Sequence, residues 1–159
     1  HNLDIELAGS FAAGAKHSKD VDILIIARKY NTRREMPVWD ITDALRTVLL
    51  ASGMVVGVLN VGKAGKITLL VRAKKGGPVR HIDIRIVAVE EEVTARMYFT
   101  SGRMFNQVVR GRAKSMGFKL NEFGLFDAAT GRRVEGLANE AAVLSKLGLD
   151  FIPLEKRRG

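Results

Sequence analysis

The chain has 159 residues, no Cys, and 26 Lys and Arg residues against 17 Asp and Glu residues, which gives a formal net charge of +9. The lack of Cys excludes disulfides and Cys-based zinc sites, and no apolar run reaches the roughly 18 residues of a membrane span, so we expect no membrane partner. The basic excess indicates an anionic partner. A chain without Cys fits the reducing interior of a cell, nuclear, mitochondrial or virus-associated alike, and we expect an intracellular protein.

The first ninety residues are predicted to form strands around a single helix. β-rich runs separated by Gly-containing breaks predict the strands, and apolar residues at helical spacing predict the helix. The expected strands cover residues 3–8, 20–27, 54–61, 67–73 and 79–89, and the expected helix covers residues 38–52. Short returns at Gly62 and Gly65, and then at Gly76 and Gly77, predict that the last three strands run antiparallel to their neighbours.

The helix expected over residues 38–52 has apolar side chains at helical spacing, which we expect to face the core: Trp39, Ile41, Leu45, Val48 and Leu49. We interpret Trp39 as a core residue rather than as a platform on which bases stack. Asp40 or Thr42 is expected to cap the start of this helix, and Gly53 follows its end.

The remaining residues are predicted to form a smaller and more basic α+β piece. Helices are expected over residues 90–98, 103–116 and 138–147, and a hairpin is expected over residues 118–126. Residues 96–159 contain 12 basic and 6 acidic residues, a net charge of +6, whereas residues 1–95 contain 14 and 11, a net charge of +3. The second piece is therefore the better candidate for contacts with phosphates.

Three carboxylates in two predicted strands carry the strongest chemical signal. Asp20 and Asp22 lie two residues apart at the start of one strand, and a period of two puts both on the same face. Asp83 lies in a second strand, where His81 and Arg85 share its face. If the two strands pair, three carboxylates converge, and they repel one another unless a cation lies between them.

The carboxylates predict a site for a hard divalent cation, because oxygen ligands suit Mg²⁺ or Mn²⁺ rather than zinc. Mg²⁺ binds through a few carboxylates together with substrate phosphates, which is the arrangement of phosphoryl-transfer sites. The turn at Gly9 and Ser10 precedes the carboxylate pair and offers backbone N–H groups and a hydroxyl to a phosphate. The alternative interpretation is that these Asp residues are solvated at strand ends and inert.

The order of these residues resembles the nucleotidyltransferase signature of the family X DNA polymerases. The signature is carried by Gly9-Ser10-Phe11-Ala12-Ala13-Gly14 and Asp20-Val21-Asp22-Ile23-Leu24, and His81-Ile82-Asp83-Ile84-Arg85 is similar to the strand of the family's third carboxylate. The likeness continues through Tyr98-Phe99-Thr100-Ser101-Gly102, Phe105-Asn106 and Arg110, then through residues 117–125 and the ending 152–157. It spans the whole chain in the family's order.

The resemblance implies an α+β fold in two parts. Residues 1–90 would be a nucleotidyltransferase palm with a mixed β-sheet that carries the catalytic carboxylates. Residues 91–159 would be a small α+β, thumb-like subdomain with a short hairpin, which contacts the nascent base pair. Asp20, Asp22 and Asp83 would be the catalytic residues and would hold two Mg²⁺ ions, with Mn²⁺ as a substitute.

The resemblance also implies which residues bind nucleotide and DNA. Those expected at the nucleotide are Gly9, Ser10, Lys19, Tyr98, Phe99, Gly102 and Asn106, with Ser10 on the triphosphate, Tyr98 and Phe99 beside the sugar, and Asn106 at the base edge. Those expected at DNA are Arg85, Arg103, Arg110, Lys114 and Lys119. Arg110 would face the template, and Arg85 would also pair with a catalytic carboxylate.

The implied activity is that of a DNA-directed DNA polymerase of the DNA repair type, which adds a deoxynucleotide from dNTP to a primer 3′-hydroxyl by a two-metal mechanism. Its partners would be primer–template or gapped DNA and dNTP, and we expect a monomer. Ala12 and Ala13 depart from the family, which usually has two Arg at these positions. Binding of the triphosphate is therefore expected to be weakened.

Two other classes of function stay open at this point. One is a template-independent transferase, or another nucleotidyltransferase on the same palm; the stretch from Tyr98 to Arg110 and the C-terminal hairpin favour the templated reaction instead. The other is a catalytically weakened DNA-binding remnant, against which the retention of all three Asp residues argues. A templated polymerase and a template-independent transferase are distinguished by whether the sequence of the product depends on a template.

Overall fold

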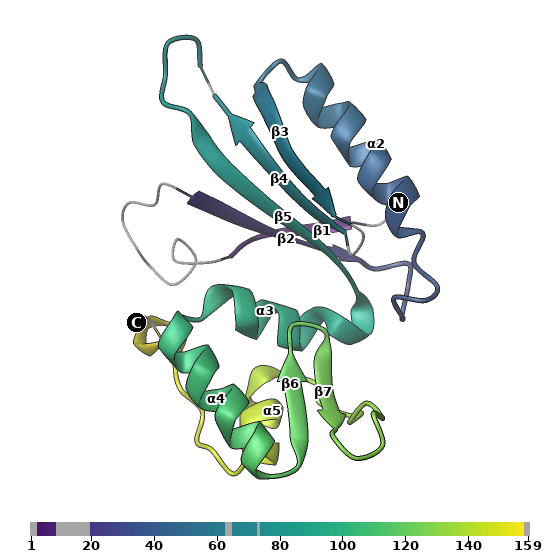
Figure 1. The fold of residues 1–159 in the computed structure, drawn as a ribbon, viewed down its shortest axis with the longest axis vertical. Coiled ribbons are helices and arrows are strands. Elements are labelled where there is room, and N and C mark those ends of the chain that lie inside the picture. The colour runs from purple at the N-terminus through teal and green to yellow at the C-terminus, as the bar shows by residue number, and fades with distance from the viewer. Residues whose placement is uncertain (1–2, 9–19, 63–64, 73, 158–159) are drawn as a thin grey trace. The chain divides into compact units, whose positions relative to one another are not determined.

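The structure is a computed structural model that describes residues 3–8, 20–62, 65–72 and 74–157 (Figure 1). The described residues form two compact units, one from residues 3–7 and 20–89 and the other from residue 8 and residues 90–157. Each unit has its own cluster of buried apolar side chains. None of the helices in this part of the chain is both long and apolar enough to cross a membrane.

The first unit is built on a five-stranded sheet in the order β1-β2-β5-β4-β3 (Figure 1). Its strands are β1 (Leu3–Ala8), β2 (Asp20–Ala27), β3 (Val55–Gly62), β4 (Lys66–Val71) and β5 (Arg80–Ala88). β2 and β5 are parallel, whereas β4 is antiparallel to both β3 and β5. The sheet is therefore mixed, and the predicted α+β class and antiparallel returns are confirmed.

The return between β3 and β4 depends on Gly65. Its φ of +78° lies in the left-handed region that favours glycine. A Cβ atom there would lie 3.0 Å from the carbonyl oxygen of Ile86. The Gly65 carbonyl accepts a hydrogen bond from the Ile86 N–H at 2.9 Å. The glycine thus lets the turn lie directly against β5.

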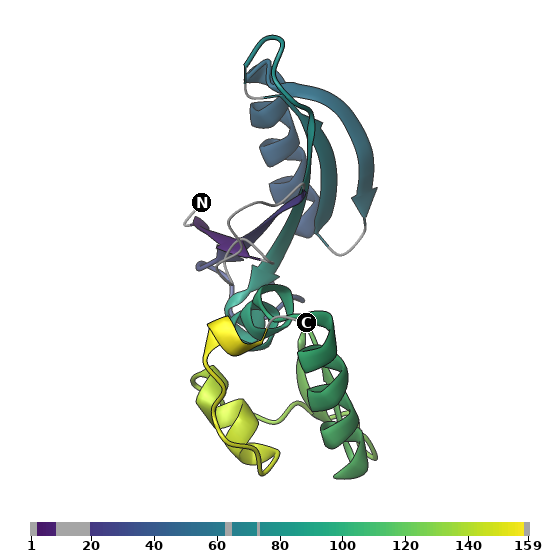
Figure 2. The same ribbon diagram turned by 90° about the vertical axis from the view of Figure 1, so that its left-hand side faces the viewer.

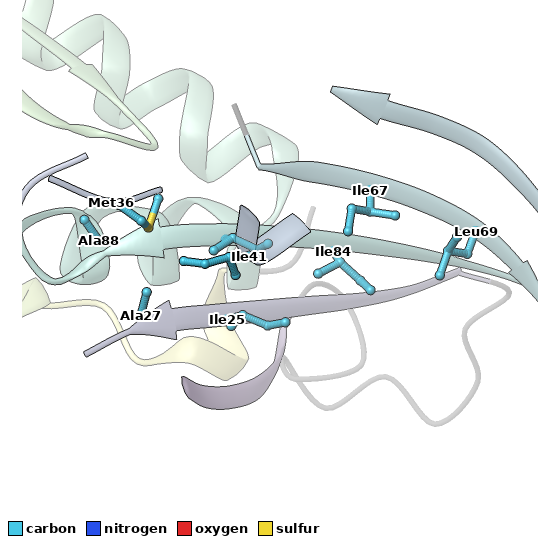
Figure 3. Close-up of a cluster of buried hydrophobic side chains, with 9 residues drawn as sticks. Ile25, Ala27, Met36, Ile41, Ile67, Leu69, Ile84 and Ala88 are labelled. Atoms are coloured by element: carbon cyan, nitrogen blue, oxygen red, sulfur yellow. The ribbon is translucent and has the colours of Figure 1, made fainter. Parts of the chain in front are cut away.

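Helix α2 (Val38–Ala51) covers one face of this sheet (Figure 2). Its Ile41 is buried in the core of this unit, most of whose residues are labelled in Figure 3. Besides Ile41 and Met36, the buried core consists of alternate strand residues: Ile25, Ala27, Ile67, Leu69, Ile84, Ile86 and Ala88. In β2 the core residues have odd numbers, and in β5 they have even numbers. Because successive strand residues alternate between faces, Asp22 and Asp83 belong to the face opposite α2.

Two expectations about this helix are wrong. Trp39 and Val48 are 50% and 67% exposed, so neither lies in the core, and the helix buries Thr42 in addition to Ile41. The core face consists of Val38, Ile41, Thr42, Leu45 and Leu49, which is the usual i, i+3, i+4, i+7 spacing of a helix face and leaves Trp39 and Val48 outside it. Neither Asp40 nor Thr42 caps the helix, because both lie inside it. The N-cap position is Pro37, and no side chain accepts a capping hydrogen bond there.

The described residues of the second unit form three helices and a two-stranded hairpin (Figure 1). After the 3₁₀ turn η1 (Val89–Glu91) come α3 (Glu92–Thr100), α4 (Arg103–Ser115), β6 (Phe118–Asn121), β7 (Gly124–Asp127), α5 (Glu140–Lys146) and the 3₁₀ turn η2 (Leu154–Lys156). The predicted hairpin is confirmed by the antiparallel pairing of β6 with β7. The core of this unit consists of Met97, Phe105, Val109, Ala113, Leu120, Leu125, Val143, Leu144 and Leu147.

Arg157 fastens the end of the described chain to this core. Its side chain is 1% exposed, and its Nη1 lies 2.8 Å from Oε1 of Glu140 on α5. Its Nε donates a hydrogen bond to the carbonyl oxygen of Ile152 at 2.7 Å. The guanidinium carbon lies 5.0 Å from the ring centre of Phe105 and 5.4 Å from that of Phe151. A buried, ion-paired cation thus joins the tail to α4 and α5.

Candidate active site

The parallel pairing of β2 with β5 brings the predicted carboxylates to neighbouring strands. Asp22 stands in register with Asp83, and Asp20 stands in register with His81 one row away. In a parallel pair, residues in register lie on the same face, and neighbouring strands are about 4.8 Å apart. Asp22 and Asp83 are both half-buried. Two carboxylates therefore stand side by side on the face of the sheet opposite α2.

Thr68 stands on the other side of Asp83. β4 runs antiparallel to β5, and Thr68 is the residue directly opposite Asp83. Its Oγ1 donates a hydrogen bond to Oδ1 of Asp83 at 2.8 Å. The row across the three strands is thus Asp22, Asp83 and Thr68.

Cations occupy the next row along the same face. Arg85 is in register with Leu24 on β2 and with Lys66 on β4. The positive charges of Arg85 and Lys66 partly offset the repulsion between the Asp22 and Asp83 carboxylates. They do not take the place of a metal ion bound between the two carboxylates. The predicted pairing of Arg85 with a catalytic carboxylate stays a prediction.

The oxygen donors of this face fit a hard divalent cation such as Mg²⁺. Among the described side chains, no three His, Cys, Asp or Glu groups gather to hold a metal ion. The third predicted ligand, Asp20, has its backbone placed in β2, but its side chain is outside the described set. The three-carboxylate site therefore stays a prediction, with Asp22 and Asp83 as its two described members.

The predicted phosphate-binding turn is outside the described residues. This applies to Gly9, Ser10 and Lys19, and also to Ala12 and Ala13, where the family usually has Arg. Their contacts with the triphosphate, and the weakening expected from the two Ala residues, stay predictions.

In the second unit, the structure brings together three of the residues predicted to bind nucleotide or template. Tyr98, Asn106 and Arg110 line a small hollow between α3, α4 and β6, together with Thr94, Met97 and Val109. The Asn106 side-chain amide donates a hydrogen bond to the carbonyl oxygen of Tyr98 at 2.9 Å. The Tyr98 ring meets Phe99 edge to face, with 4.9 Å between ring centres. This hollow is the candidate nucleotide-facing surface.

Arg110 already has two partners in this hollow. Its guanidinium carbon lies 4.3 Å from the centre of the Tyr98 ring, a cation–π contact. Its Nη2 lies 3.2 Å from Oε2 of Glu122, and both side chains are about a third exposed. An exposed ion pair of this kind is worth about 0–1 kcal/mol, so the Glu122 carboxylate by itself holds Arg110 only weakly.

The remaining predicted residues lie at the ends of α4 and on the hairpin. Gly102 precedes α4, and its N–H donates a hydrogen bond to the Arg157 carbonyl at 2.6 Å. Arg103 begins α4, Lys114 lies in its last turn and Lys119 lies on β6, and all three are exposed. Three cations are thus accessible to solvent on this unit, away from the buried core.

Sequence reasoning assigned no individual role to three residues that contact the predicted ones: Thr68, Glu122 and Arg157. Their predicted partners are Asp83, Arg110 and Gly102, all of them distant in sequence. For Thr68 the available signal was the predicted antiparallel return at Gly76 and Gly77, which brings β4 beside β5, the strand of Asp83.

Known proteins resemble this chain in both sequence and fold. Residues 95–158 match the family model of the DNA polymerase beta thumb. The structure is similar to a crystal structure of Leishmania infantum polymerase beta, described as a ternary P/T complex, with a TM-score of 0.84 and 25% sequence identity. This match covers 99% of the present chain and 68% of the Leishmania chain.

Proposed function

We propose that this chain is a family X DNA polymerase that extends a DNA primer by adding deoxynucleotides from dNTP in the order set by a template. The match of residues 95–158 to the DNA polymerase beta thumb and the similarity of the fold to the Leishmania polymerase support this proposal. The substrate is primer–template or gapped DNA, as in DNA repair. The protein acts as a monomer.

The observation that carries the proposal is the row of Asp22 and Asp83 in a chain with this thumb. Paired carboxylates on one sheet face fit phosphoryl transfer, because they can hold a divalent cation whose positive charge also binds the phosphates of a nucleoside triphosphate. The match to the polymerase beta thumb favours DNA as the second substrate over a small molecule.

We propose that Asp20, Asp22 and Asp83 hold two Mg²⁺ ions, for which Mn²⁺ substitutes. When bound, these ions supply positive charge that makes the primer 3′-hydroxyl a better nucleophile and stabilises the leaving pyrophosphate. The carboxylates contribute by standing in fixed register on a sheet, so that little reorganisation accompanies the reaction. No Ser or His nucleophile is required.

The second unit supplies selection in this proposal. Tyr98 and Phe99 present ring faces and edges to the sugar of the incoming nucleotide, and Asn106 presents its amide to the base edge. Arg110 leaves Glu122 to contact the template strand. The exposed cations Arg103, Lys114 and Lys119 hold DNA phosphates.

Primer extension tests this function directly. The chain would be incubated with single-stranded or gapped DNA and with each dNTP separately, in Mg²⁺ and in Mn²⁺. If the proposal is right, only the nucleotide complementary to the template base is added to the primer of the gapped DNA. Addition irrespective of template would instead indicate a template-independent transferase, and DNA binding without any addition would indicate a weakened remnant.

DNA affinity is expected to fall steeply with salt. The net charge of +6 over residues 96–159 implies contacts with phosphates, and each contact lowers log K by about 0.9 per decade of salt on duplex DNA. Fluorescence anisotropy of a labelled duplex, titrated at several salt concentrations, measures the slope. A flat salt dependence would contradict phosphate binding by this part of the chain.

Replacing Arg110 with Ala is expected to lower kcat/KM for correct insertion by about ten- to a hundredfold, because a hydrogen bond to a charged group is worth roughly 1.5–3 kcal/mol. Single-nucleotide insertion kinetics give the measurement. Lys146→Ala is the matched control, since it removes an exposed cation of the same unit outside the hollow. Equal losses in the two variants would mean that Arg110 contributes only to the general positive charge.

A further inference from the structure

The proposed reaction gives no role to Thr68, although its hydroxyl donates a hydrogen bond to Asp83. Thr68 Oγ1 donates to Asp83 Oδ1 at 2.8 Å in a half-buried setting. Among the described residues, the Thr68 hydroxyl is the side-chain hydrogen-bond partner of this carboxylate. The contact joins β4 to the β5 carboxylate that the proposed reaction uses.

The position of the Thr68 hydroxyl is fixed by the strand that carries it. Ile67 and Leu69, on either side, are 0% and 1% exposed in the core on the α2 face of the sheet. Because side chains alternate along a strand, these anchors turn Thr68 toward the opposite face, where Asp83 lies. A slip of one residue would bury the hydroxyl and expose the anchors, so the register is strongly specified.

The bond determines how the Asp83 carboxylate is presented. A carboxylate has two oxygens and about four acceptor positions, and its terminal torsion has no sharp minimum of its own. Asp22 stands beside Asp83 on β2, and repulsion between two like charges favours rotation of either carboxylate. A donor that holds Oδ1 from the β4 side opposes this rotation and leaves Oδ2 for a cation.

Resting on the proposed function, we propose that Thr68 is a positioning residue that fixes the Asp83 carboxylate for binding the divalent cation. It acts through Asp83 and does not touch the substrates. Groups that orient a metal ligand from behind typically change metal affinity or activity by 10–100-fold when they are removed. Thr68 belongs to this class by geometry.

The first test measures metal binding without DNA or nucleotide. Mn²⁺ would be titrated into the full chain and followed by electron paramagnetic resonance for the wild type, Thr68→Val and Thr68→Ser. Thr68→Val keeps the β-branched shape without the hydroxyl and is expected to weaken Mn²⁺ binding by about 10–100-fold. Thr68→Ser keeps the hydroxyl and is expected to restore binding close to the wild-type value.

The second test separates positioning from nucleotide binding. Single-nucleotide insertion by Thr68→Val is expected to show a lower kcat with an unchanged KM for dNTP, because Tyr98 and Asn106 are untouched. Thr47→Val is the matched control: it removes a hydroxyl that donates to the Asp43 carbonyl within α2. This control should leave both measurements unchanged, and urea unfolding of each variant verifies that the sheet is intact.

Three outcomes distinguish the proposals. Wild-type Mn²⁺ affinity and kcat in Thr68→Val would overturn the role of Thr68. Failure of Thr68→Ser to restore either quantity would also overturn it, because the effect would then come from packing. If the wild type extends no primer, the proposed function fails, but the Mn²⁺ titration still decides whether Thr68 positions Asp83.

Discussion

Replacing Asp83 with Ala should abolish nucleotide addition while leaving the fold intact. Asp83 stands in register with Asp22 and is a proposed ligand of the catalytic cation. The loss of one preorganised charge-stabilising group costs about 10²–10³ in rate, and we expect the upper end of that range or more because the cation itself is lost. Primer extension under single-turnover conditions gives the measurement.

The stability of this variant separates catalysis from folding. Removing Asp83 takes away repulsion with Asp22 but leaves the Thr68 hydroxyl without its acceptor, so the free energy of unfolding should change by no more than about 1 kcal/mol. Asp83→Asn is the sharper form of the test, since it retains an acceptor for Thr68 and removes only the charge. Asp43→Ala, at an exposed position on α2, is the control for charge. Undiminished activity in Asp83→Asn would contradict the assignment of Asp83 as a ligand of the catalytic cation.

Replacing Arg157 with Met should lower the free energy of unfolding of the second unit by more than any substitution on its surface. Breaking a buried ion pair by removing one partner costs about 3–5 kcal/mol, and we expect the lower end because the Glu140 side chain is 24% exposed and keeps some water. The contacts of the guanidinium with the Phe105 and Phe151 rings are lost as well. Urea unfolding followed by circular dichroism measures the change.

The adjacent Lys156 provides the control for this prediction. Lys156→Met removes an exposed cation one residue away and should change the free energy of unfolding by less than about 0.5 kcal/mol. Adding Glu140→Leu to Arg157→Met should cost less than the sum of the single changes, because no uncompensated charge then remains. Equal stability of Lys156→Met and Arg157→Met would show that the ion pair contributes nothing to holding the tail.

The strands, and the face of each strand on which Asp22 and Asp83 lie, were predictable because their signals are local. Asp22 and Asp83 each lie in a β-rich run, and a period of two fixes the face of each within its own strand. The parallel direction of β2 relative to β5 was not predictable, because it depends on the packing of the whole sheet. Thr68 was missed for the same reason, since only the register with β5 gives its hydroxyl an acceptor.

The errors on α2 and the oversight at Arg157 also have physical causes. Trp39 and Val48 are apolar and near the correct helical spacing, but a helix covering one sheet face buries a narrow stripe, so residues at its border are exposed. Arg157 lies in a run of cations that reads as solvent-exposed. Its burial depends on Glu140 and on two rings, none of which is adjacent in sequence.

The parallel pairing of β2 with β5 also bears on how the first unit folds. Residues 28–79 separate the two strands, whereas β3, β4 and β5 pair across short turns. Closing a long loop costs more chain entropy before any contact is gained, so local hairpins form more readily than this pair. We therefore expect Asp22 and Asp83 to come together late in the folding of the sheet, so that a partly folded chain with only the β3-β4-β5 meander would lack the carboxylate pair.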